Sequence, residues 1–312
     1  LWSTPKVEMV AFNKSKMGVK TLGLGAGPLL SSIVASIQHT RDPLVLVAAI
    51  SYLMAGLFAG ILFLFLLLTP RDHQELVDAK IAMDAYQEVE HEAGHEADEA
   101  DELAAEKLPL EKRNQMLVLS LIYGTERACM VCALEAATSM ILEVEFKWSS
   151  RDAGWAVGIV FLGTVPYMLF GERMKRCLRI HEIGWMLCCA SSSVLACLAI
   201  FPVFTTRTTV ILIADGFIFA NGYLANGIID GLAYRSCSDD SWLTTSQFLL
   251  TQSISQMALS RPLGPILARY LVELGGREYY AVGQFLMSIS GLVCCLKVVY
   301  LMIRRGAPKS LM

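Results

Sequence analysis

Long apolar runs separated by short polar connections dominate the pattern of this chain. Each run approaches the roughly 20 residues that a helix needs to cross a bilayer, and we count eight: 17–38, 44–68, 115–142, 153–170, 183–204, 209–233, 244–274 and 279–302. Lipid offers the backbone no hydrogen-bond partner, so a spanning segment in an open chain must be a helix. The pattern therefore predicts an all-α membrane protein with eight transmembrane helices.

One long polar segment, 70–113, interrupts this pattern after the second run. It contains 14 acidic and 5 basic residues, a net charge of −9, whereas the rest of the chain carries +6. Two predicted helices precede it and six follow it. The chain therefore divides into a partial N-terminal bundle over 1–69, an acidic linker over 70–113, and a six-helix bundle over 114–312.

Composition excludes several other classes of protein. Hydrophobic residues make up 54% of the chain and charged residues 18%, against about 45–50% and about 25% in soluble domains. Such a chain has too few polar groups to cover a soluble enzyme, and it is too apolar to be disordered. Because Leu1 stands where Met would begin a complete chain, we expect a piece of a longer protein.

The distribution of Lys and Arg predicts the orientation of the helices. Basic residues concentrate in the N-terminal stretch, in the connection 171–182 and in the C-terminal tail, which all fall on one side if the helices alternate. Cytoplasmic connections carry this excess. We therefore expect a multi-pass protein with both termini and the acidic linker in the cytoplasm, and the sequence favours neither the plasma membrane nor an organelle.

A short repeat relates the two proposed halves. Gly27-Pro28 in the first run and Gly264-Pro265 in the seventh are each followed by two aliphatic residues. Glycine lets two helices approach closely, and proline removes a backbone hydrogen bond and bends its helix. Internal repeats of this kind are typical of secondary transporters.

These motifs resemble the major facilitator superfamily. Gly23, Gly27 and Pro28 match the motif of its fifth helix, although serines stand where later glycines are usual. The connection after the fourth predicted run resembles a degraded form of the family's cytoplasmic loop, Gly…Asp-Arg-x-Gly-Arg-Arg, through Gly171, Glu172, Arg173 and Arg176. The resemblance implies a partial fold of this family: the last two helices of its N-terminal half and the complete six-helix C-terminal half.

A looser resemblance points to one branch of that family. Trp148-Ser149, Ala153-Gly154 and Arg261 are similar to the SPX-type branch, whose members include vacuolar phosphate carriers. This similarity is a lead toward that branch only, because the sequence contains no SPX domain.

Ionisable side chains within the apolar runs are the first candidate site residues, because burying charge in a membrane is costly. Glu126 and Arg127 lie near the middle of the 115–142 run, and Glu135 lies further along it. One interpretation is a proton-titrating carboxylate beside a substrate-binding cation. The other is an interhelical ion pair that fixes packing.

Polar residues in two later runs extend the candidate site. Asp215 and Asn226 fall on one face of the 209–233 run, with Asn221 nearby, and Asp230 is expected near its cytoplasmic end. Arg261 lies one turn before Pro265 in the 244–274 run, in which Gln252 and Gln256 also share a face. A guanidinium binds carboxylate or phosphate in a bidentate manner, so Arg127 and Arg261 indicate an anion site. Pairing of these arginines with Glu126 or Asp215 is the alternative.

Two motifs look like metal sites but have simpler explanations. His91-Glu92-Ala93-Gly94-His95 matches the zinc-protease pattern, yet it lies in the charged linker with no room for a catalytic domain. Cys129 and Cys132 lie inside an apolar run without a second pair, which favours packing. We expect no metal, no cofactor, no enzymatic activity and no nucleic-acid partner.

Secondary active transport is the function that these features favour. The solute would be small, with an anion favoured, and it would move by alternating access, coupled to protons through Glu126 or Asp215. The expected partners are the lipid bilayer, the solute and protons. The alternative is a non-transporting receptor or scaffold that acts through the acidic segment. A channel is disfavoured because the sequence contains no recognisable filter.

Overall fold

A computed structural model describes residues 109–237 and 240–303, together with scattered helical positions between 29 and 63. The expected helices over 17–38 and 44–68 and nearly all of the acidic linker lie outside the described residues. The same is true of Gly23, Gly27 and Pro28, and of the side chains of Glu172 and Arg176.

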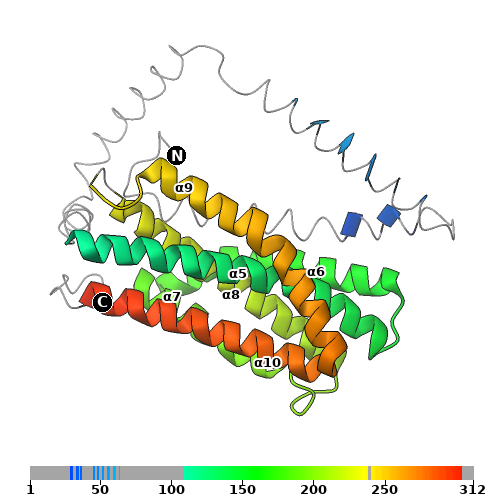
Figure 1. Ribbon diagram of the computed structural model, residues 1–312. Helices are drawn as coiled ribbons and strands as arrows, with labels where there is room; N and C mark the ends of the chain where they lie inside the picture. Colours follow the sequence, from blue (N-terminus) through cyan, green and yellow to red (C-terminus); the bar gives the residue numbers. More distant parts are fainter. Residues whose placement is uncertain are drawn as a thin grey trace.

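Within the described residues the fold is entirely helical and contains no strand. The elements are α5 (Leu110–Val144), α6 (Ser150–Cys177), α7 (Glu182–Leu198), α8 (Thr208–Ser236), α9 (Thr245–Ser253), the π-helix η1 (Ile254–Ser260) and α10 (Arg261–Ile303). The elements lie side by side in a bundle, with η1 joining α9 directly to α10 (Figure 1). All six apolar runs predicted between 115 and 302 are therefore helical.

Among the residues that the structure describes, four helical stretches are long and apolar enough to cross a membrane: Leu110–Val144, Ser150–Lys175, Thr208–Ser236 and Thr245–Met302. The helix predicted over 183–204 is shorter than expected, because α7 ends at Leu198. Ile200 and Phe201 donate their backbone N–H groups to carbonyls three residues back, which tightens the chain into a turn. Pro202 follows at once, and the residue before a proline avoids the helical conformation.

The stretch Thr245–Met302 contains two helices rather than one. Its 58 residues would form a rod about 87 Å long, almost three times the roughly 30 Å of a hydrocarbon core. The backbone leaves the helical conformation at Gly275 and Gly276, where Gly276 has φ 67° and ψ −155°. Figure 1 shows the chain turning back there, where α10 changes from orange to red. The predicted break between 274 and 279 is thus confirmed.

Large apolar side chains cover both the interior and much of the outer surface. Phe161 on α6 stacks on Phe219 of α8 in the core, with ring centroids 4.4 Å apart. On the outside, Ile213 and Leu286 are each 60% exposed. An apolar exterior of this kind is stable against lipid tails rather than water.

Candidate functional site

A small cavity, with a volume of about 20 Å³, opens between α5, α8 and the η1–α10 junction. Its only charged lining groups among the described residues are Arg127 and Arg261, and its polar lining includes Tyr223, Asn226 and Gln256. No carboxylate contributes to that described lining. The cavity therefore carries a positive potential.

Arg127 enters the bundle between two glycines on different helices. Its side chain is only 2% exposed. A β-carbon at Gly222 of α8 would lie 2.5 Å from Arg127 Cδ, and one at Gly291 of α10 would lie 3.1 Å from Nη2. The Tyr123 ring lies 5.2 Å from the guanidinium carbon, in cation–π range. The absence of two β-carbons thus makes the space that this guanidinium occupies.

The donors of Arg127 are poorly satisfied. Nη1 donates to Met130 Sδ at 3.4 Å, and a thioether is a weak acceptor. Within the described part of the chain, Nε and Nη2 have no hydrogen-bond partner, and no carboxylate lies within 4 Å of the guanidinium. A buried cation without acceptors is costly, so an anion in the adjoining cavity would supply what the protein does not.

The π-helix explains how Gln256 and Arg261 reach the same cavity. Five residues separate them, which in an α-helix places two side chains about 140° apart. In a π-helix the hydrogen bonds run from i to i+5, so residues five apart come onto nearly the same face. The Ser260 hydroxyl lies 2.9 Å from Ser255 O and 2.7 Å from Thr125 O of α5, which ties η1 to the neighbouring helix.

A buried network orients the amide of Asn226. Its Nδ2 donates to Asp230 Oδ2 at 2.9 Å, and Asp230 Oδ1 accepts from Ser120 of α5 at 2.8 Å. A β-carbon at Gly124 would lie 3.3 Å from Asn226 Oδ1 and 2.5 Å from Gln256 Nε2. The two amides thus face each other across a glycine of α5. Asp230, which we expected near the solvated helix end, is only 1% exposed.

Three predicted site residues lie outside the cavity and bond to partners of their own. Asp215 Oδ2 accepts from Thr138 at 2.6 Å, Asn221 accepts from Tyr167 at 2.9 Å, and Gln252 accepts from Tyr234 at 2.8 Å. The polar face expected along 209–233 therefore contributes only Asn226 to the lining. Asp215 is 2% exposed and joins α8 to α5.

Glu126 and Glu135, the two predicted site carboxylates of α5, do not line the cavity. Glu126 Oε1 would lie 3.2 Å from a β-carbon at Gly291, the same glycine that Arg127 contacts. Glu135 is half-buried further along α5. Glu126 is thus the carboxylate that lies close enough to interact electrostatically with Arg127.

The motif residues that the structure describes serve helix packing. A β-carbon at Gly264 would collide with Cys129 O and Ala133 N of α5, and Pro265 follows inside α10. Gly171 is buried beside Trp185 and Leu224, and Arg173 lies over the Phe170 ring. Cys129 and Cys132 are free thiols. The close helix approach expected at Gly264 is therefore present.

Arg277 was not singled out from the sequence, where it falls in the short connection between the predicted runs 244–274 and 279–302. Its side chain is only 5% exposed. It donates to Ile200 O and Thr205 O, and Nη1 pairs with Glu145 Oε1 at 3.2 Å. The sequence did contain one indication of its role, a positive charge directly after Gly275-Gly276 between two predicted helices. Arg277 fastens α5, the α7–α8 connection and α10 at one end of the bundle.

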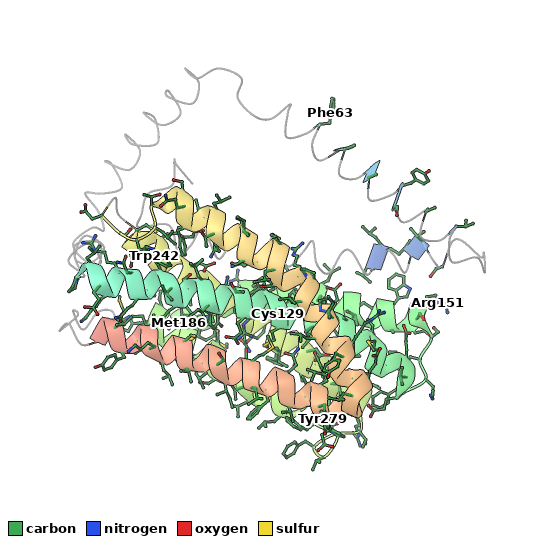
Figure 2. All side chains as sticks on the ribbon, viewed as in Figure 1. Phe63, Cys129, Arg151, Met186, Trp242 and Tyr279 are labelled. Atoms are coloured by element: carbon green, nitrogen blue, oxygen red, sulfur yellow. The ribbon has the colours of Figure 1, made fainter. Side chains whose placement is uncertain are left out.

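In Figure 2, Arg151 and Tyr279 lie toward one end of the bundle, Trp242 lies toward the opposite end, and Cys129 lies near the middle.

Comparison of the chain with protein-family models, curated proteins and solved structures finds no match in any of the three. The fold and the cavity alone define the class: an all-α membrane protein with a cationic cavity inside its helical bundle.

Proposed function

We propose that this protein is a secondary active transporter of a small anion. The observation that carries the proposal is the convergence of Arg127 and Arg261 with the amides of Asn226 and Gln256 in one cavity whose described lining has no carboxylate. Guanidinium and amide N–H groups are the donors that carboxylate, phosphate and sulfate groups accept. The buried donors of Arg127 favour an anion over a neutral solute.

The architecture supports a fold of the major facilitator type, working by alternating access. Six helical segments follow the acidic linker, and the fifth of them carries Gly264-Pro265 against α5. In this proposal they form one complete half of the transporter, the two helices before the linker belong to the other half, and all eight span the membrane. The termini and the linker then face the cytoplasm, as the basic residues predict.

Proton coupling is the part of the proposal that rests on Glu126. It neighbours Arg127 in sequence, and both contact the position of Gly291. Two charged side chains that approach the same position interact strongly in a low dielectric. Protonation of Glu126 would therefore change how firmly Arg127 holds an anion.

Uptake by the purified protein in vesicles tests the proposal, with labelled phosphate, sulfate and succinate as probes. We expect uptake of at least one anion to increase with an imposed pH gradient. Arg127→Gln and Arg261→Gln should abolish it. Arg269→Gln is the matched control, because Arg269 is an exposed arginine of α10 outside the cavity lining. Equal uptake by all three variants would contradict the proposed site.

Deleting 72–108 separates transport from the receptor or scaffold alternative. A transporter should keep its flux, because linkers tolerate changes in length. A scaffold has no flux of its own, and the deletion should abolish binding of its partner protein.

A further inference from the structure

A second cavity, with about 610 Å³ of empty space, lies at one end of the bundle, away from the anion cavity. The start of α5 and the end of α10 form it, and these ends lie side by side in Figure 1. The lining residues are Glu111, Lys112, Gln115, Lys297, Tyr300 and Leu301. The part of this space that a bound molecule could occupy is about 280 Å³, near the lower end of the range of small-molecule sites.

An exposed tryptophan beside this cavity indicates its depth relative to a membrane. Trp242 is 64% exposed, and its backbone N–H donates to Asn114 Oδ1 at 2.9 Å. Asn114 directly precedes Gln115 of the lining. Exposed tryptophan favours the depth of lipid headgroups, so the cavity lies where headgroups lie.

Its charges form a specific pattern of two ammonium groups and one carboxylate. Lys112 and Lys297 come from different helices, and Lys297 Nζ lies 5.2 Å from the Tyr300 ring centroid. Gln115 Nε2 lies 3.4 Å from Glu111 Oε1. A ligand that complements this pattern carries two anionic groups and one cation.

Apolar side chains continue from the cavity toward the middle of the bundle. Val118 lies three residues beyond Gln115 on α5, and Val293 lies four residues before Lys297 on α10, so each shares a helix face with a lining residue. Val118 is 36% and Val293 58% exposed. A molecule seated in the cavity would therefore find an apolar surface for a hydrocarbon chain.

We infer that this cavity binds phosphatidylserine. The phosphate and the carboxylate of its headgroup would bind Lys112 and Lys297, and its ammonium group would bind Glu111. Its acyl chains would lie along Val118 and Val293. With the proposed orientation this site faces the cytoplasmic leaflet, where anionic lipids concentrate. The inference does not depend on transport or on the anion cavity.

Native mass spectrometry of the purified chain tests this site, with phosphatidylserine, phosphatidylglycerol and phosphatidylcholine of identical acyl chains. We expect phosphatidylserine to bind most tightly. Lys112→Gln combined with Lys297→Gln should weaken its binding about 30-fold, because each lysine near anionic lipid strengthens binding about fivefold. Glu111→Gln should erase the preference over phosphatidylglycerol, which has no ammonium group. Lys147→Gln should change nothing, because Lys147 is an exposed lysine that follows the C-terminal end of α5, whereas the start of α5 lines the cavity.

Three results would overturn the inference. One is equal binding of phosphatidylserine and phosphatidylcholine, and another is wild-type binding by the double lysine variant. The third is competition by soluble glycerophosphoserine at the same concentration as the lipid, which would indicate a site for a free anion. Lys112→Arg with Lys297→Arg keeps both charges and should restore binding, which separates lost charge from misfolding.

Discussion

Arg127 of α5 and Gly222 of α8 approach so closely that a β-carbon at position 222 would lie 2.5 Å from Arg127 Cδ. Gly222→Ala should therefore displace the guanidinium from its place beside the cavity. We expect the free energy of unfolding in detergent to fall by about 1–3 kcal/mol, as for other overpacked cores. Gly163→Ala is the matched control, because nothing lies within 4 Å of a β-carbon at this exposed position of α6. That variant should be unchanged or stabilised by up to about 1 kcal/mol.

Replacing Arg127 with an apolar side chain separates binding from folding. Because no carboxylate of the described residues pairs with it, Arg127→Met should leave the stability unchanged or raise it by about 1–4 kcal/mol. The stabilisation that phosphate or sulfate gives the wild type in thermal unfolding should disappear. A loss of about 3–5 kcal/mol would instead indicate a structural ion pair.

Glu126 and Asp215 should differ in their effects on coupling. Asp215 is committed to Thr138 away from the cavity, and an asparagine oxygen still accepts that hydrogen bond. Asp215→Asn should therefore keep uptake dependent on the pH gradient, whereas Glu126→Gln should make it independent. Vesicle uptake at equal and unequal pH measures both, and the reverse pattern would transfer the coupling role to Asp215.

Arg277 should matter for stability and not for binding. Arg277→Ala leaves the carbonyl groups of Ile200 and Thr205 without their donor. We expect a loss of about 2–4 kcal/mol in unfolding free energy and unchanged anion affinity in the folded fraction. Arg207→Ala, an exposed arginine near Thr205, should have little effect.

The turn inside α10 requires glycine at one position. Gly276 has φ 67° and ψ −155°, a combination that other residues adopt only under strain. Gly276→Ala should cost about 1–3 kcal/mol, although nothing lies within 4 Å of its β-carbon. Equal stability of this variant and the wild type would mean that the turn can relax. Chemical unfolding in detergent measures the difference.

The apolar runs predicted the helices well because spanning segments must be both long and helical. The convergence of Arg127 and Arg261 on one cavity was also predictable, since charged residues within apolar runs are few and costly. The sequence did not predict that Asp215, Asn221 and Gln252 lie outside the cavity. Whether a buried polar group lines a cavity or bonds to a neighbouring helix depends on which face that helix presents, and single-helix periodicity does not contain this information.

The position of Arg261 shows the same limit more sharply. Periodicity at 100° per residue turns Arg261 about 140° away from Gln256, yet both residues line the cavity. The π-helical turn between them changes that phase, and no residue type within 254–260 announces it.

This π-helical turn contains one residue more than a regular α-helix needs to bring Gln256 and Arg261 onto one face. A relative one residue shorter within 254–260 could continue as a regular α-helix, and its counterpart of Arg261 would lie four residues from that of Gln256, still on the same face. A sequence alignment of relatives should therefore allow a single-residue gap there, because an ungapped alignment would equate positions that face different surroundings. For this cavity, the placement of that gap decides which residue of a relative is compared with Arg261.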